Sequence, residues 1–256
     1  MNRINKLFTE KKNILSIYYT AGFPNLNDTV TILKSLEKAG ADIVELGMPF
    51  SDPLADGPTI QDSSLVALNN GMSIKVLFEQ LKDVRKEVSI PIVLMGYINP
   101  VHKYGIEKFA KKCQEVGVDG VIIPDLPFDE YNDKYKSTFE AVGVSNIFLV
   151  TPQSPEARIR AIDTNTNGFI YVVSSAAVTG AKSGLSTTQI EYFQKLQNMK
   201  LKNPSLIGFG ISDNESFKAT CKYASGAIVG SAFVKLLATS KDLEVDITNF
   251  IKELKR

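Results

Sequence analysis

The stretch "EKAGADIVELG", residues 37–47, shows how this chain is built. A charged, amphipathic segment ends at Gly40, and an apolar run begins three residues later. Glycine suits the left-handed conformation that closes a helix, and a short apolar run is typical of a buried strand. The same arrangement recurs in "QEVGVDGVIIP" (114–124) and "EAVGVSNIFLV" (140–150). These stretches predict a repeated step from a helix, through a glycine, into a strand.

Short β-branched runs recur along the whole chain. They are "ILSIYYTAG" from residue 14, "DIVELG" from 42, "PIVLMGY" from 91, "DGVIIP" from 119, "NIFLVT" from 146, "FIYVVS" from 169, "SLIGFG" from 205 and "GAIVG" from 226. Helical patterns such as "NDTVTILKSLEKAG" lie between them, and this alternation predicts a parallel sheet. Eight such units without a Gly/Ser-rich linker favour a single α/β domain over residues 1–256, a (β/α)8 TIM barrel. An open eight-stranded sheet is the alternative.

Two segments exceed the basic repeat. The residues before the first strand predict an extra N-terminal helix across the bottom of the barrel, and "SIKVLFEQLKDVRKEV" (73–88) predicts an extra helix after the second strand.

Composition excludes several classes of protein. With 29 basic and 28 acidic residues the net charge is +1, so no broad field is available to hold nucleic acid or an anionic membrane. Cys113 and Cys221 stand far from any CxxC or His-rich spacing, which argues against a disulfide framework or a zinc site. The N-terminus lacks an apolar signal core, and we expect a cytoplasmic protein.

Glu45 is the first candidate for chemistry, because reacting groups in a barrel stand at the carboxyl ends of strands. It shares strand parity with Ile43, so both side chains are expected to point into the barrel. A carboxyl desolvated there has a raised pKa and can donate and accept protons near neutral pH. The alternative is a glutamate paired with a barrel lysine or arginine, but no predicted strand ends in either residue.

The loop "MPFSDPLADGP" (48–58) follows directly and carries three prolines, which restrict its backbone. Asp56 in this loop is a second candidate carboxylate, placed to accept a hydrogen bond from a substrate N–H. Its alternative is a turn aspartate that caps the next helix. Asp52 is a weaker candidate on the same loop.

Glycines mark the loops after the last three predicted strands, in "VTG" ending at Gly180, "GFGIS" (208–212) and "VGSA" (229–232). Glycine lets backbone N–H groups approach an oxyanion, and Ser231 begins a helical run whose N-terminus would face the same place. Many barrels bind phosphate there. The only histidine is His102, and no lysine ends a predicted strand, so a His-based metal site, a catalytic triad and Schiff-base chemistry are all disfavoured. Carboxylate acid/base chemistry on a phosphorylated substrate remains.

The stretch "VELGMPFSDPLADGP" (44–58), followed in order by "YVVSSAAVTG", "GFGIS" and "GSAFV", resembles the tryptophan synthase alpha subunit family over essentially the whole chain. The resemblance implies a (β/α)8 barrel that cleaves indole-3-glycerol phosphate to indole and glyceraldehyde 3-phosphate. It also implies a beta subunit partner in an alpha2beta2 heterotetramer, with pyridoxal phosphate in the partner and no cofactor in this chain.

The same resemblance implies a role for individual residues. Glu45 matches the catalytic acid/base and Asp56 the carboxylate that holds the indole N–H. The positions that match substrate contacts are Tyr171, Thr179, Gly180, Gly210, Gly230 and Ser231. The positions that match partner-facing loops are Asp52, Pro53, Asn99, Pro100 and Asp125.

One loop departs from the family pattern. Ser175 and Ala177, in the loop after the sixth predicted strand, stand where the family often has an arginine and a glycine. This difference bears on how the loop closes over the mouth of the barrel. Residues 175–185 are small and polar, and we expect them to be mobile without ligand. Three other functions stay open at this point: a stand-alone indole-releasing lyase, a non-catalytic phosphate-ligand-binding barrel, and another phosphate-binding barrel such as an isomerase or indole-glycerol-phosphate synthase.

Overall fold

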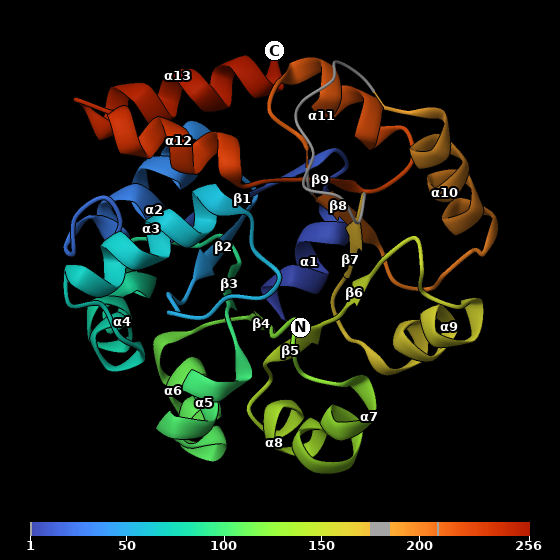
Figure 1. Ribbon diagram of the computed structural model, residues 1–256, viewed down its shortest axis with the longest axis horizontal. Coiled ribbons are helices and arrows are strands. Elements are labelled where there is room, and N and C mark those ends of the chain that lie inside the picture. Colours follow the sequence, from blue (N-terminus) through green and yellow to red (C-terminus); the bar gives the residue numbers. More distant parts are fainter. Residues whose placement is uncertain (1, 175–184, 209) are drawn as a thin grey trace.

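Nine strand segments form one parallel sheet in the order β5-β4-β3-β2-β1-β9-β8-β7-β6 (Figure 1). The computed structural model describes residues 2–174, 185–208 and 210–256. The strand segments are β1 (Ile14–Thr20), β2 (Ile43–Gly47), β3 (Ile92–Met95), β4 (Gly120–Ile122), β5 (Ser145–Ile147), β6 (Leu149–Val150), β7 (Ile170–Val173), β8 (Ser205–Gly208) and β9 (Gly226–Val229).

The two ends of this sheet are joined by the chain itself. β5 and β6 are halves of one extended segment interrupted at Phe148, with β5 paired to β4 and β6 paired to β7. The ring of strands is therefore closed, and the predicted (β/α)8 barrel is confirmed with its fifth strand divided in two. At the division, the Phe148 ring packs on Phe128 and Tyr131 in the outer layer, with 5.2 Å between ring centroids in each pair.

Figure 1 shows α1 (Arg3–Glu10) at its centre and the other helices around the strands. These others are α2 (Asp28–Ala39), α3 (Pro58–Asn69), α4 (Ile74–Leu81), the 3-10 turn η1 (Val84–Lys86), α5 (Ile98–Tyr104), α6 (Ile106–Val116), α7 (Phe128–Glu130), the π-helical turn η2 (Tyr131–Tyr135), α8 (Lys136–Ala141), α9 (Glu156–Asn165), α10 (Thr187–Asn198), α11 (Asn214–Cys221), α12 (Ser231–Thr239) and α13 (Leu243–Lys255). None of the described helices is long and apolar enough to cross a membrane.

The predicted step from helix through glycine to strand is present. Gly40 closes α2 with φ 100° and Gly117 closes α6 with φ 77°, a left-handed conformation that costs other residues more.

Two apolar clusters lie on the two sides of the strands. The larger one joins the strands to the helices, and the smaller one fills the barrel interior. The interior cluster is Ile4, Leu7, Ile14, Ile43, Val93, Ile122, Ile147, Phe169, Tyr171, Val173, Leu206 and Ile228. Ile4 and Leu7 come from α1, which lies at the centre of the view in Figure 1. The predicted N-terminal helix thus closes the amino end of the barrel.

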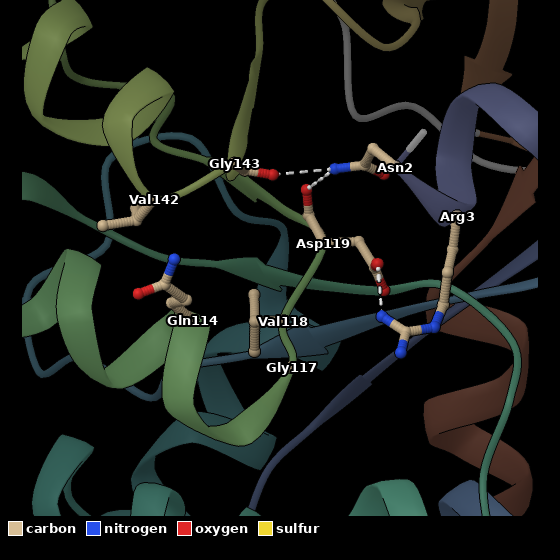
Figure 2. A pocket seen from close by; sticks show the side chains of 8 residues that line it. All are labelled: Asn2, Arg3, Gln114, Gly117, Val118, Asp119, Val142 and Gly143. Carbon is tan, nitrogen blue, oxygen red and sulfur yellow. Dashed lines mark hydrogen bonds and ion pairs between the residues drawn. The ribbon is translucent and has the colours of Figure 1, made fainter.

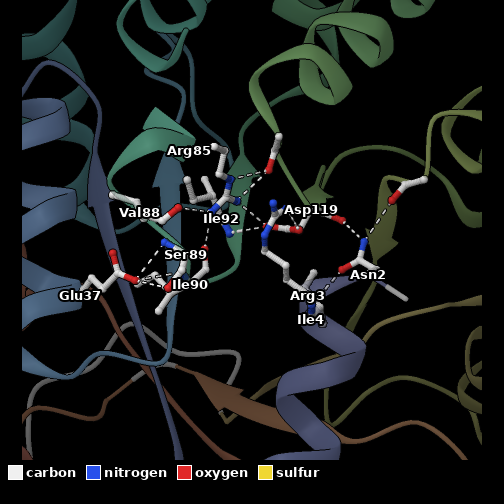
Figure 3. A network of polar contacts seen from close by, with 12 residues as sticks. Asn2, Arg3, Ile4, Glu37, Arg85, Val88, Ser89, Ile90, Ile92 and Asp119 are labelled. Atoms are coloured by element: carbon white, nitrogen blue, oxygen red, sulfur yellow. Dashed lines mark hydrogen bonds and ion pairs between the residues drawn. The ribbon is translucent and has the colours of Figure 1, made fainter. Parts of the chain in front are cut away.

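Buried charge at this amino end, the barrel bottom, is compensated. Asp119, just before β4, is 4% exposed, and its carboxylate pairs with Arg3 at 3.0 Å and Arg85 at 2.6 Å (Figure 3). It also accepts a hydrogen bond from Ile92 N at 3.0 Å. Asn2 caps α1 and donates to the carbonyl oxygens of Asp119 and Gly143. These contacts tie α1 to the starts of β3, β4 and β5.

A cavity of about 420 Å³ opens beside this network, lined by Asn2, Arg3, Gln114, Gly117, Val118, Asp119, Val142 and Gly143 (Figure 2). Its charged groups, Arg3 and Asp119, already pair with each other. It lies at the opposite end of the barrel from the carboxyl ends of the strands, and we do not regard it as the site of chemistry.

Two sequence predictions need correction. The helix expected over 73–88 is α4, which ends at Leu81, followed by η1. The reason is tertiary, because the Arg85 guanidinium donates to the carbonyl oxygens of Gly117, Val88 and Ile90 while it pairs with Asp119.

The second correction concerns Asn99 and Pro100, which were expected on a loop and instead lie in the helix α5. Its proline, Pro100, lies in the first turn, where the missing N–H costs no intrahelical hydrogen bond. His102 is therefore on a helix, exposed, with its Nε2 3.2 Å from the Tyr135 hydroxyl.

Candidate active site

Glu45 lies inside the barrel near its carboxyl end. It is two residues before the end of β2, in register with Tyr18 of β1 and Val93 of β3, and its side chain is fully buried. It shares strand parity with Ile43, a member of the interior cluster. The expected orientation of the side chain is confirmed.

Ser16 is the one hydrogen-bond partner of the Glu45 carboxyl among the described residues. Its hydroxyl donates to Oε1 at 2.8 Å, whereas Oε2 is buried with no partner in that part of the chain. No lysine or arginine there forms a salt bridge with Glu45, which removes the alternative of a paired structural glutamate within the described region. Burial raises the pKa of Glu45 to about 8, and the hydrogen bond from Ser16 opposes this rise. Such a carboxyl is largely protonated at neutral pH.

Asp56 lies on the loop after β2 and is half-buried. Its Oδ2 accepts a hydrogen bond from the Tyr97 hydroxyl at 2.9 Å. The following helix, α3, begins after Gly57 without any side-chain cap, so the alternative of a helix-capping aspartate is wrong. Burial raises the pKa of Asp56, and the hydrogen bond from Tyr97 opposes the rise. The side chain of Asp56 is thus hydrogen-bonded to a residue just after barrel strand β3.

A narrow pocket lies beside Asp56 at the mouth of the barrel. It is lined by Tyr18, Met48, Phe50, Asp56, Ser64, Met95, Gly96, Tyr97 and Pro124. Aromatic and thioether side chains beside one carboxylate suit a flat apolar ring that carries a single N–H.

Tyr18 and Tyr171 lie close to both carboxylates. Burial first, and then the charges of Asp56 and Glu45, raise the pKa of each tyrosine hydroxyl. A Cβ atom on Gly47 would lie 2.2 Å from the Tyr18 hydroxyl, so only glycine leaves room for that ring. Gly208 has the same relation to Tyr171, at 2.4 Å. Both hydroxyls are thus fixed at the carboxyl ends of strands.

The predicted phosphate positions are described in part. Gly230 directly precedes α12, whose first turn has no side-chain cap from the described residues and no acidic residue, so this helix N-terminus suits an anion. A Cβ on Gly230 would lie 3.6 Å from Cβ of Tyr18, which places this helix end beside the narrow pocket. Ser231 and Gly210 are exposed, and Gly210 has φ 79°. Thr179, Gly180, Ser175 and Ala177 lie outside the described residues, as does nearly all of the loop expected to be mobile.

The predicted partner-facing residues lie on three segments around the same mouth. Asp52 is exposed and Pro53 half-buried on the loop after β2, where the neighbouring Leu54 is 91% exposed. Asn99 is exposed and Pro100 half-buried in the first turn of α5. Asp125 is exposed, and its Oδ1 accepts a hydrogen bond from Ile98 N at 2.9 Å, so it also fixes the start of α5.

Ser16, Tyr18 and Tyr97 belong to this site, although no motif in the sequence indicated them. Ser16 and Tyr18 alternate with apolar residues in "ILSIYYT", and this parity was a signal that polar groups face the barrel interior. Tyr97 lies two residues after the end of β3, and this position just after a strand was the only signal in the sequence for its hydroxyl. Its partner is 41 residues away in the sequence, and no local pattern predicts that contact.

No cluster of three or more His, Cys, Asp or Glu side chains that could hold a metal ion occurs in residues 2–174, 185–208 and 210–256. Within the described residues the site offers the carboxyls of Glu45 and Asp56, three tyrosine hydroxyls and a helix N-terminus without a side-chain cap.

The chain is similar to known proteins over essentially its whole length. A family model described as "Tryptophan synthase alpha chain" matches residues 4–255. The chain is 57% identical over 254 residues to the tryptophan synthase alpha chain of Flavobacterium psychrophilum, covering 99% of this chain and 100% of that one.

Solved structures are similar over the same length. Tryptophan synthase subunit alpha from Legionella pneumophila superposes with a TM-score of 0.89 at 32% identity, covering 100% of this chain and 97% of that one. A chain from the tryptophan synthase complex of Pyrococcus furiosus superposes with a TM-score of 0.87 at 34% identity, covering 95% and 98%.

Proposed function

The chain belongs to the tryptophan synthase alpha chain family, and from this premise we propose that Glu45 and Asp56 carry out its reaction. The chain is a lyase that cleaves indole-3-glycerol phosphate to indole and glyceraldehyde 3-phosphate. The observation that carries the proposal for Glu45 is its buried carboxyl, which faces the interior of the barrel with one oxygen unpaired among the described residues.

The reaction requires two proton transfers. Indole C3 must gain a proton, so that the ring becomes an indolenine cation, and the side-chain hydroxyl next to the breaking C–C bond must lose one as the aldehyde forms. A carboxyl with a pKa of about 8 is protonated at neutral pH and can give the first proton. The resulting carboxylate can then accept the second. Glu45 ends as it began, and the C–C bond electrons return to the indole ring.

Positive charge develops on the indole nitrogen while C3 is protonated. An ionised Asp56 beside that N–H stabilises the charge, and the effect is strong because the pocket is largely apolar. In our proposal Tyr171 packs against the reacting part of the substrate. The substrate phosphate binds the N-terminus of α12 at Gly230 and Ser231, together with Gly210, Thr179 and Gly180.

The beta subunit is the partner of this family, and pyridoxal phosphate belongs to that subunit rather than to this chain. We propose that Asp52, Pro53, Asn99, Pro100 and Asp125 face it in an alpha2beta2 tetramer. The 91% exposure of Leu54 on the mouth loop supports a docked partner over a stand-alone lyase, because an apolar side chain in that position gains from being covered. We also propose that residues 1–256 form one domain and that the protein works in the cytoplasm, which its role in amino-acid biosynthesis supports.

Glu45→Gln tests the central role. The amide keeps the shape and the hydrogen bond from Ser16 but cannot shuttle a proton, so indole release should fall about a hundredfold or more. The assay follows indole from indole-3-glycerol phosphate, with and without a beta subunit. Glu253→Gln, an exposed glutamate on α13, is the matched control and should keep wild-type turnover. Near-normal turnover of the Glu45 variant would end the proposal.

A further inference from the structure

Tyr97 joins the barrel wall to the loop that carries Asp56. Its side chain is 5% exposed, and its hydroxyl has two partners on that loop. The hydroxyl accepts a hydrogen bond from Ala55 N at 3.0 Å and donates one to Asp56 Oδ2 at 2.9 Å. One hydroxyl therefore orients both the backbone and the carboxylate of consecutive residues.

The phenol ring makes a further contact with the same loop. It packs on Phe50, with ring centroids 5.3 Å apart. Tyr97 is also the residue just before α5, and the first N–H of that helix, from Ile98, donates to Asp125. The ring thus extends from a capped helix start, whereas the loop it contacts has an almost fully exposed tip at Leu54. Tyr97 therefore connects the start of α5 to the loop that carries Asp56.

The two oxygens of Asp56 are left in different situations. Oδ2 is occupied by the Tyr97 hydroxyl, and Oδ1 has no hydrogen bond with the described residues. A hydroxyl that donates to a carboxylate favours its charged form, and the Tyr97 hydroxyl thereby opposes part of the rise that burial causes in the pKa of Asp56. An ionised carboxylate with one oxygen free is what the indole N–H requires.

We propose that Tyr97 is the positioning residue of this site, whose hydroxyl turns the Asp56 carboxylate so that Oδ1 receives the indole N–H. The inference rests on the proposed role of Asp56. Tyr97 itself exchanges no proton with the substrate in this account. It acts through the carboxylate, and its contribution grows as positive charge develops on the indole nitrogen.

Tyr97→Phe removes the hydroxyl and keeps the ring contact with Phe50. We expect kcat to fall about tenfold or more, in line with the loss of a hydrogen bond to a charged group. KM should change less, because the contact matters most when the nitrogen is cationic. The acid side of the pH profile of kcat/KM should move to higher pH, because Asp56 loses the group that favours its ionised form.

Tyr104→Phe is the matched control, since Tyr104 ends the same helix and packs through its ring on Phe78 and Phe109. It should leave kcat and the pH profile unchanged. Thermal unfolding of both variants shows whether the fold is kept.

Asp56→Asn, alone and combined with Tyr97→Phe, distinguishes the role of Tyr97 from that of Asp56. If Tyr97 acts through Asp56, the double variant is no slower than Asp56→Asn alone. Normal turnover in Asp56→Asn would overturn the proposed role of Asp56 itself. A slow Asp56→Asn variant, together with a Tyr97→Phe variant that behaves like Tyr104→Phe or with fully additive losses, would overturn the inference about Tyr97 only.

Discussion

Asp42 directly precedes β2 and Glu45 lies in the middle of the strand, and their two carboxyls have opposite surroundings. Asp42 faces the barrel bottom, where Lys11 and Lys255 pair with it at 2.9 and 2.7 Å and Leu15 N donates to it. These contacts outweigh burial and hold the pKa of Asp42 below its usual value. Glu45 has one hydroxyl partner among the described residues, and burial raises its pKa.

The presence or absence of a cationic partner distinguishes the carboxyls that stabilise the fold from those that we propose act in the reaction. Buried carboxyls at the bottom, Asp42 and Asp119, are compensated by cations from helices and thereby connect distant parts of the chain. At the mouth, the buried carboxyl of Glu45 and the half-buried one of Asp56 have only hydroxyl partners in the described structure. A buried carboxyl without a cationic partner destabilises the folded protein. Such a carboxyl also has a perturbed pKa, which is the property that proton transfer at the mouth of the barrel requires.

The largest expected effect concerns the stability of Glu45→Gln as the pH changes. The folded pKa of Glu45, about 8, is above the unfolded value of 4.5, so wild-type stability should fall as pH rises between these values. The glutamine variant lacks this loss. Its free energy of unfolding should therefore gain on wild type by roughly 3–5 kcal/mol between pH 5 and pH 8. Urea unfolding at both pH values measures this, and a gap that does not grow with pH would mean that Glu45 is not desolvated.

Asp119→Asn tests the bottom of the barrel. The amide can still accept the hydrogen bond from Ile92 N but leaves the Arg85 guanidinium, whose side chain is 17% exposed, without its anion. We expect the free energy of unfolding to fall by about 2–3 kcal/mol, because a buried charge loses its partner. Turnover per folded molecule should stay near wild type. A variant as stable as wild type but slow in catalysis would reverse the distinction between the two ends.

Gly230→Asp probes a smaller effect at the start of α12. The starts of α1 and α12 differ as the two ends of the barrel do, with compensation at the bottom and little of it at the mouth. The start of α1 is satisfied by its own Asn2 side chain, whereas α12 begins without a side-chain cap. A carboxylate at position 230 would occupy the place proposed for the substrate phosphate. KM for indole-3-glycerol phosphate should rise about tenfold or more, while the affinity for free indole changes little. Equal losses for both ligands would indicate a general change of fold.

Much of the architecture could be predicted from local pattern. Strand parity placed Glu45 beside Ile43 on the interior face, and Gly40 and Gly117 marked the ends of helices, because both signals depend only on neighbours in the chain. The resemblance to the family rests on short motifs for the same reason. The division of the fifth strand at Phe148 and the early end of α4 escaped prediction, since ring packing and the partners of Arg85 decide them.

What the sequence by itself determined is the alternation of strands and helices, which favours a barrel over an open sheet, and the presence of a carboxyl on an inward-facing position of β2. Only the tertiary structure decided which groups that carboxyl and its neighbour meet. Ser16 reaches Glu45 because β1 and β2 pair in one register, and Tyr97 reaches Asp56 because β2 and β3 end side by side. Hydrogen bonds depend on distances of about 3 Å between side chains that chain order leaves tens of residues apart, so strand register and loop packing had to set them.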